Sequence, residues 1–220
     1  MYTTKQPEGN QNASVLRSLR SLAPQRALAF SEALQIAELQ ANRLRTLHEL
    51  GDQVAPREMV SELPRVVISY DADLPVSGSS HWNGSTWVIT LSANESWTRQ
   101  RFTLMHEFKH IVDHGQQHRL YTGNDKITGE RQAEQAADYF AGCVLMPKRL
   151  LKRAWCSGMQ RPSELAAHFG VSAKAVEVRL SQTGLRDNTR RCDPRRSPDS
   201  FNVGIYFRTR PQLQAAGANR

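Results

Sequence analysis

The chain has 220 residues, of which 39% are hydrophobic and 23% charged, and its formal net charge is +8. This length allows one globular domain with a small appendage, and no run approaches the about 18 apolar residues that a membrane-spanning helix needs. Its three cysteines lack paired spacing, which argues against a disulfide framework and favours a reducing, cytoplasmic environment.

Both ends of the chain are polar. Residues 1–25 show little periodicity and lack the apolar core of a signal peptide, so we expect them to be mostly disordered. Residues 186–220 hold eight Arg and three Asp, a net charge of +5 that leaves +3 for residues 1–185. This basic tail could touch nucleic acid or an acidic surface, but a solvated, disordered tail is the favoured interpretation.

Between these ends the pattern predicts a long helix and then a small sheet. Apolar residues of segment 26–50 fall on one broad helical face. The run 66–70 is β-branched, and Asn83-Gly84 predicts a two-residue hairpin that leads into a strand over 86–91. We therefore expect a mostly antiparallel sheet in which strand 86–91 forms an edge able to receive an extended peptide.

The sequence HEFKH follows, on a helix for which Ser96 is the expected N-cap. His106 and His110 lie on one helical face about 6 Å apart along the axis, so their rings can converge on one metal ion. Glu107, one step around the helix, could hold and deprotonate an attacking water. An apolar arc on the opposite side, which begins with Trp97, should pack against the body of the protein.

A catalytic zinc site usually has three protein ligands and an open position for water. His114 is one candidate for the third ligand, but it lies about another 6 Å along the same helix, which one tetrahedral ion does not accommodate. Glu130 and Glu134 open a second helix expected over 129–145. Glu134 is preferred because Asp138 lies on its face, where a carboxylate could accept the free N–H of a ligating imidazole.

Two stretches, RQRFTLMHEFKHIVDHG at 99–115 and EQAADYFAGCVLMP at 134–147, resemble the ImmA/IrrE-type metallopeptidases. The resemblance covers about residues 27–185. It implies an α+β, zincin-like core in which a small sheet packs on the HExxH helix. It also implies a gluzincin-like site with His106, His110 and Glu134 on zinc and Glu107 as catalytic base. The partner it implies is a protein substrate, commonly a helix-turn-helix transcriptional repressor.

The spacing of apolar residues in segment 161–182 is typical of a helix-turn-helix, with Gly170 at the turn and Ser172 as the N-cap of the second helix. In a DNA-binding interpretation, Lys174 and Arg179 would be the main base-reading groups of the second helix. A packed helical subdomain is favoured instead.

The expected organisation is therefore a disordered N-terminus (1–25), a metallopeptidase domain (26–147), a helical subdomain (148–185) and a basic, disordered tail (186–220).

The leading hypothesis is a cytoplasmic, zinc-dependent endopeptidase that acts on a regulatory protein. One alternative is a DNA-associated regulator with a structural or inactive metal site, and another is a hydrolase of a small amide. Zinc is the commonest occupant of such a site, although manganese and iron also suit these donors. His81, Tyr121 and Tyr139 are candidates for a second oxyanion donor.

Overall fold

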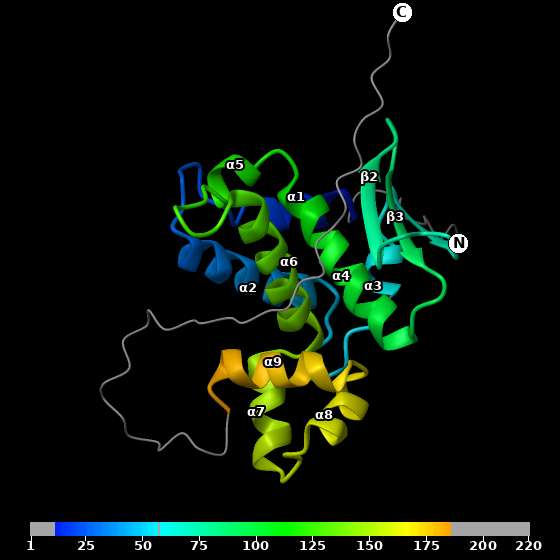
Figure 1. Ribbon diagram of the computed structural model, residues 1–220, viewed down its shortest axis with the longest axis vertical. Coiled ribbons are helices and arrows are strands. Elements are labelled where there is room, and N and C mark those ends of the chain that lie inside the picture. Colours follow the sequence, from blue (N-terminus) through cyan, green and yellow to red (C-terminus); the bar gives the residue numbers. More distant parts are fainter. Residues whose placement is uncertain (1–11, 57, 186–220) are drawn as a thin grey trace, which may run out of the picture.

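The computed structural model describes residues 12–56 and 58–185, which form an α+β fold (Figure 1). The strands are β1 (Val66–Asp71), β2 (Gly78–Trp82) and β3 (Trp87–Ser92). The helices are α1 (Asn12–Arg20), α2 (Phe30–Leu47), α3 (Glu58–Ser61), α4 (Trp97–Asp113), α5 (Gln117–Leu120), α6 (Gly129–Leu145), α7 (Lys148–Cys156), α8 (Pro162–Phe169) and α9 (Ala173–Thr183). The expectations for the basic tail and for residues 1–11 lie outside the described residues. None of the helices within the described ranges is both long and apolar enough to cross a lipid bilayer.

Helix α1 contradicts the expectation that residues 1–25 are mostly disordered. Val15 and Leu19, one helical turn apart, are buried in the main hydrophobic cluster. The Gln40 side-chain amide of α2 donates to the Leu19 carbonyl at 3.1 Å. A short helix of this kind gains its stability from tertiary contacts, which its own sequence does not reveal.

The sheet is mixed, with strand order β1-β3-β2. The β2–β3 pair is the antiparallel hairpin that Asn83-Gly84 predicts, with Gly84 at φ +100°. However, β1 pairs with β3 in parallel, so the expectation of a mostly antiparallel sheet is wrong. Strand β3 is central and not an edge strand, because β2 pairs with one side of it and β1 with the other.

Helix α4 lies between the sheet and α6, and α6 in turn packs against α2 (Figure 1). The buried face of α4 consists of Leu104, Met105, Phe108, Ile111 and Val112. Trp97 does not extend this face, since 52% of it is exposed and its ring lies 5.3 Å from the Arg101 guanidinium carbon. The sheet contributes Ile89 and Leu91 to the same core.

Helices α7, α8 and α9 gather at one end of the molecule (Figure 1). Gly170 takes a left-handed conformation at the turn, with φ +62°, and the Ser172 side chain caps α9 by accepting from the Ala175 N–H at 3.1 Å, as the sequence predicts. Leu165 and Phe169 of α8 belong to the same buried cluster as Leu104 of α4. The helical C-terminal piece therefore shares a core with the helix that carries the HExxH motif.

Four arginines bind backbone carbonyls at the C-terminal ends of other helices, where the regular helical pattern leaves the last carbonyls without partners. The Ile111 carbonyl also accepts from the His114 N–H at 3.3 Å. The bonds run from Arg20 to Ile111 (2.8 Å) and Val112 (3.1 Å), from Arg45 to Val144 (3.0 Å), from Arg101 to Phe169 (2.6 Å) and Gly170 (2.8 Å), and from Arg179 to Met146 (3.1 Å).

The last of these contacts counts against the less favoured DNA-binding interpretation, in which Arg179 would read bases. Its side chain is 2% exposed, so it is unavailable as a base-reading group.

Candidate metal centre

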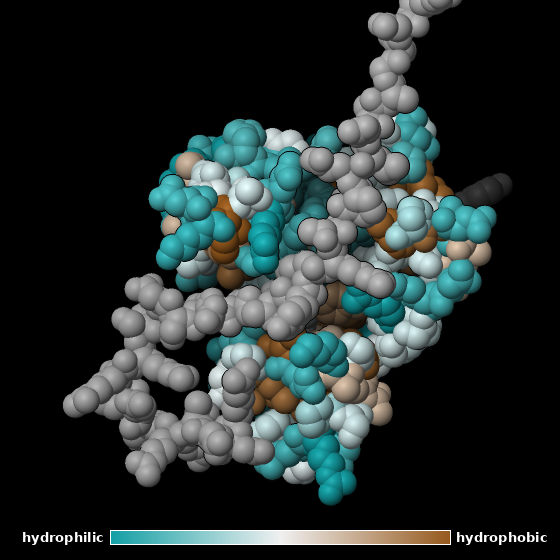
Figure 2. All heavy atoms as spheres, in the orientation of Figure 1, coloured by the Kyte–Doolittle hydropathy of each residue, from teal (hydrophilic) through white to brown (hydrophobic). Residues whose placement is uncertain are grey.

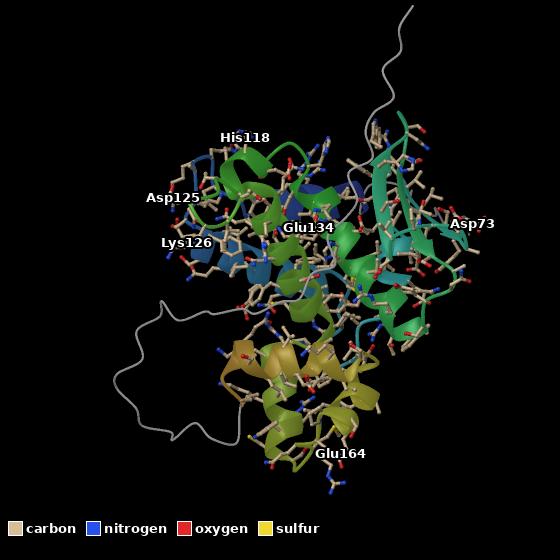
Figure 3. The ribbon with its side chains drawn as sticks, viewed as in Figure 1. Asp73, His118, Asp125, Lys126, Glu134 and Glu164 are labelled. Carbon is tan, nitrogen blue, oxygen red and sulfur yellow. The ribbon has the colours of Figure 1, made fainter. Side chains whose placement is uncertain are left out.

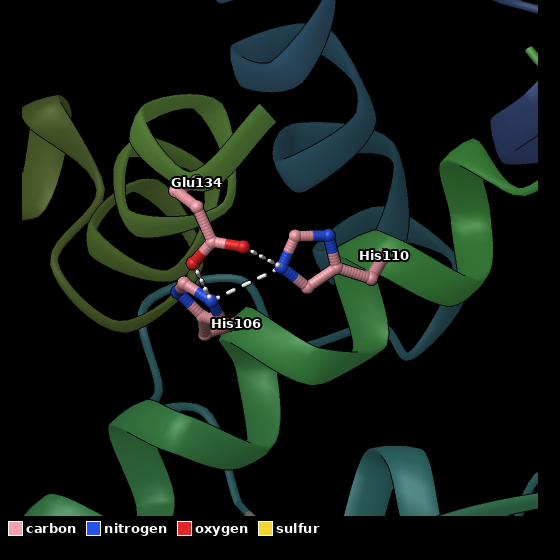
Figure 4. Close-up of side chains that lie close together, drawn as sticks. All are labelled: His106, His110 and Glu134. Atoms are coloured by element: carbon pink, nitrogen blue, oxygen red, sulfur yellow. Dashed lines mark hydrogen bonds and ion pairs between the residues drawn. The ribbon is translucent and has the colours of Figure 1, made fainter. Parts of the chain in front are cut away.

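Helix α4 holds the two histidines of the motif side by side. Ser96 caps the helix by accepting a hydrogen bond from the Arg99 N–H at 3.4 Å. One turn separates His106 from His110, and their Nε2 atoms lie 3.1 Å apart (Figure 4). Both rings thus present a nitrogen to the same point on the surface of α4.

Helix α6 brings the third donor to this point. Glu134 Oε2 lies 3.3 Å from His106 Nε2, and Oε1 lies 3.4 Å from His110 Nε2 (Figure 4). In the view of Figure 3, Glu134 lies near the middle of the picture, where α6 passes α4, and 37% of its side chain is exposed. The other candidates lie elsewhere: the His114 ring packs on Trp87 with centroids 4.8 Å apart, and Glu130 is exposed in the first turn of α6.

Asp138, one turn beyond Glu134, sets the orientation of His106. Its Oδ1 lies 2.7 Å from His106 Nδ1, so the ring donates its Nδ1 proton there and turns Nε2 toward Glu134. Burial by itself would lower the pKa of His106, but the hydrogen bonds to Asp138 and Glu134 outweigh burial and raise it to about 10. Burial and the neighbouring His106 charge lower the pKa of His110.

Glu107 is buried beside the histidines, with 3% of its surface exposed. The Ser80 hydroxyl of β2 donates to Glu107 Oε2 at 2.9 Å. Gly78 allows this close approach, because a Cβ atom there would collide with Thr103 and press on Glu107. Sequence reasoning missed Ser80, although residues 78, 80 and 82 alternate onto one face of the strand.

A buried polar network lies one turn further along α4. Lys109 Nζ lies 2.5 Å from Asp113 Oδ1 and 2.7 Å from Gln40 Oε1, and the Tyr121 hydroxyl lies 2.5 Å from Asp113 Oδ2. Burial lowers the pKa of Lys109, against the opposing effect of the Asp113 charge, and burial raises that of Tyr121. These contacts fix α4 against α2 and the segment after α5.

Of the three candidate oxyanion donors, both tyrosine hydroxyls are engaged with carboxylates: Tyr121 with Asp113, and Tyr139 with Glu38 at 2.9 Å. His81 is exposed on β2, on the strand face opposite Ser80.

The donor set fits a zinc ion. Two imidazole nitrogens at about 2.0–2.1 Å from a tetrahedral zinc lie about 3.3 Å apart, close to the Nε2 separation described above. The three donor atoms of His106, His110 and Glu134 lie within 4.8 Å of one another. Within residues 12–56 and 58–185, this is the group of His, Cys, Asp and Glu side chains that could hold a metal ion.

Known proteins resemble this chain in family and in fold. Residues 63–181 match the IrrE N-terminal-like domain, peptidase family M78. No curated protein matches the chain. Among solved structures, a Mycobacterium tuberculosis transcriptional regulator is similar, with a TM-score of 0.55 and 19% identity over 80% of this chain and 54% of the regulator. The chain thus spans about half of that protein, and the similarity shows the fold alone.

The match to the peptidase family covers more than half of the chain and includes the HExxH helix, Glu134, α8 and most of α9. The protein therefore belongs to the ImmA/IrrE family of metallopeptidases.

Proposed function

We propose that the protein is a zinc-dependent endopeptidase of the cytoplasm that cuts a peptide bond in a regulatory partner, with a helix-turn-helix repressor as the favoured substrate. The observation that carries this proposal is the position of Glu134, within 3.4 Å of both imidazoles. Glu107 lies buried one step around the same helix, where a catalytic base is needed. The packing of α4 against α6 and β2 supports a zincin-like core.

A bound zinc ion would supply Lewis acidity, which polarises a peptide carbonyl and makes water more acidic. His106, His110 and Glu134 would hold the ion, with Asp138 fixing the His106 ring. Glu107 would accept a proton from the attacking water and return it to the leaving amine. Ser80 holds one carboxylate oxygen of Glu107 and leaves Oε1 for this transfer.

An extended substrate could add to the outer edge of β2. The Ser92 N–H donates to the Ser77 carbonyl, and the Asn83 N–H to the Thr86 carbonyl, so residues 77 and 83 turn their backbone groups toward β3. By the alternation of an antiparallel ladder, the backbone groups of Gly78, Ser80 and Trp82 point outward. No strand in the described part of the chain pairs with this edge. A peptide there would pass directly beside Glu107.

The surface hollow supports the same path. The molecular surface recedes between the α5–α6 side and strands β2 and β3, and hydrophilic residues line the recess (Figure 2). Glu134 lies in this part of the molecule (Figure 3).

The alternative function, a DNA-associated regulator with an inactive metal site, draws less support from the described residues. Arg179 is buried, and Lys174 lies 3.4 Å from Glu177 in an exposed ion pair. The α8–α9 pair also packs its apolar side into the core shared with α4. Tight, salt-sensitive and sequence-selective DNA binding without proteolysis would favour this alternative.

The decisive experiment is co-expression of the full chain with a helix-turn-helix protein encoded beside its gene. We expect a discrete cleavage, mapped by mass spectrometry, that Glu107→Gln abolishes while zinc stays near one equivalent. Glu130→Gln, an exposed change in the first turn of α6, should leave cleavage intact. Cleavage that persists in the Glu107→Gln variant would remove Glu107 from its proposed role.

A further inference from the structure

An aromatic cluster lies beyond the metal centre, at the end of the β2–β3 hairpin. Trp82 and Trp87 are register partners with ring centroids 5.5 Å apart, and the Trp87 ring meets the His114 ring edge-on at 4.8 Å. His114 directly follows the last residue of α4. We call these three residues the aromatic shelf; it joins the strand edge to the end of the helix that carries the HExxH motif.

The shelf is aligned with the proposed substrate path. Trp82 lies two residues beyond Ser80, so its side chain is on the same strand face, about 7 Å further along. Ser80 contacts Glu107. Because Glu107 is the proposed base, the scissile bond of a bound peptide would lie close to Ser80. A peptide paired with β2 would place every second side chain on this face, and one of them would lie beside Trp82.

The exposure of the rings indicates the kind of side chain that the shelf would bind. Trp87 is half-buried and packs against the hydrophobic core, whereas 43% of Trp82 is exposed. The aromatic shelf thus lies at the edge of the hydrophobic core, where packing holds the Trp87 ring in place and the Trp82 ring faces solvent. A bulky apolar or aromatic side chain would cover Trp82 and meet a rigid indole surface.

We propose that Trp82, Trp87 and His114 form a specificity subsite for a bulky apolar or aromatic side chain of the substrate, an inference that rests on the proposed endopeptidase function. A peptide antiparallel to β2 runs from Trp82 toward Gly78. The side chain on the shelf then precedes the scissile bond in sequence. Phe, Tyr, Trp or Leu should occupy that position.

The test uses the zinc-loaded full chain and a library of short synthetic peptides, with cleavage sites mapped by mass spectrometry. We expect enrichment of Phe, Tyr, Trp and Leu at one fixed position on the amino-terminal side of the cut. For a matched pair of peptides with Phe or Ala at that position, Trp82→Ala should lower the ratio of their kcat/KM values about tenfold. Trp82→Phe should restore most of this ratio.

The matched control is Val67→Ala, which removes an apolar side chain that is 48% exposed on the opposite face of the sheet, and it should keep the wild-type ratio. An unchanged ratio in Trp82→Ala would overturn the proposal, as would enrichment of Lys or Arg at the mapped position.

A binding measurement separates this proposal from the endopeptidase function. In the zinc-loaded Glu107→Gln protein, fluorescence anisotropy should show that the labelled Phe peptide binds about tenfold more tightly than the Ala peptide. Adding Trp82→Ala should remove that difference. If the Phe and Ala peptides bind equally well to the Glu107→Gln protein that retains Trp82, the proposed specificity subsite is refuted. An absence of wild-type cleavage together with this binding preference would instead count against the endopeptidase function alone.

Discussion

At the scale of single residues, two side chains that do not bind the metal set the orientation of those that act there: Asp138 orients the ligand His106, and Ser80 orients the proposed base Glu107. Asp138 fixes the tautomer of His106 through a bond of 2.7 Å, and Ser80 holds the Glu107 carboxylate at 2.9 Å. Each acts by restricting rotation about the side-chain bonds of its partner. The two contacts make separable contributions, since one concerns metal affinity and the other the turnover of bound substrate.

Asp138→Asn should weaken zinc binding about 10–100-fold, because an amide cannot supply the negative charge that strengthens His106 as a ligand. Competition with a chromophoric chelator measures the change. Asp125→Asn is the control, since Asp125 lies on an exposed loop far from Glu134 (Figure 3). Equal zinc affinity in the Asp138→Asn and wild-type proteins would show that this carboxylate does not support the ligand.

Ser80→Ala should lower kcat for a cleaved peptide by up to about a hundredfold, because the Glu107 carboxylate loses the contact that sets its position. Zinc stoichiometry and KM should change little, as Ser80 contacts neither the ligands' nitrogen atoms nor Glu134 in the bonds described. Ser79→Ala provides the comparison, since that side chain points to the other strand face. A rise in KM with kcat intact would assign Ser80 to substrate binding instead.

The arginine contacts act at the scale of elements, because each guanidinium ties one helix to the carbonyl end of another. Arg20 joins α1 to the end of α4, at the two residues that directly follow His110. Arg101 joins α4 to the α8–α9 turn, and it also donates to the Ala55 carbonyl. A guanidinium has several donors in one plane, so it can satisfy two carbonyls at once, which a lysine cannot do in the same geometry.

Arg20→Met should lower the free energy of unfolding by about 1–3 kcal/mol, since the partly buried Val112 carbonyl loses its donor and the Ile111 carbonyl keeps only the His114 N–H, at 3.3 Å. Urea unfolding of the zinc-loaded protein, followed by circular dichroism, gives the difference. Arg17→Met changes an exposed arginine on the same helix and should fall within about 0.5 kcal/mol of the wild type. Similar losses for both variants would point to a general charge effect rather than to the carbonyl contacts.

A metal ion would tie together separate parts of the whole molecule, because its ligands come from both α4 and α6. Removing zinc with a chelator should therefore lower Tm, by the linkage between ligand binding and folding. At a free zinc concentration of 1,000 times Kd, the stabilisation is about 4 kcal/mol. Glu134→Gln, which weakens the third ligand, should show a much smaller difference between zinc-loaded and chelated samples in differential scanning calorimetry. A chelator effect as large in that variant as in the wild type would place the zinc elsewhere.

The parts that the sequence predicted are those with local signals. The HExxH helix, the α6 helix, the Asn83-Gly84 hairpin and the Ser172 cap each depend on neighbouring residues. Glu134 was preferred because it shares a helix face with Asp138, and the structure places it beside both imidazoles.

What the sequence did not reveal depends on partners distant along the chain. The parallel pairing of β1 with β3, the packing of α1, and the contact from Ser80 to Glu107 join segments whose spacing carries no signal. The burial of Arg179 was unpredictable for the same reason, since an arginine on an amphipathic helix is expected to be exposed until its carbonyl partner is known.

The buried amide of Gln40 has a practical consequence for anyone who trims this protein. It bridges the Leu19 carbonyl and the Lys109 ammonium, and both it and Arg45 precede the segment that matches the peptidase family. An expression boundary at residue 63 would leave the Lys109 ammonium in the interior with one fewer acceptor, and the Val144 carbonyl of α6 without its Arg45 donor. A stable fragment should therefore include α2, which carries Gln40 and Arg45, and also α1, whose Leu19 carbonyl accepts from the Gln40 amide.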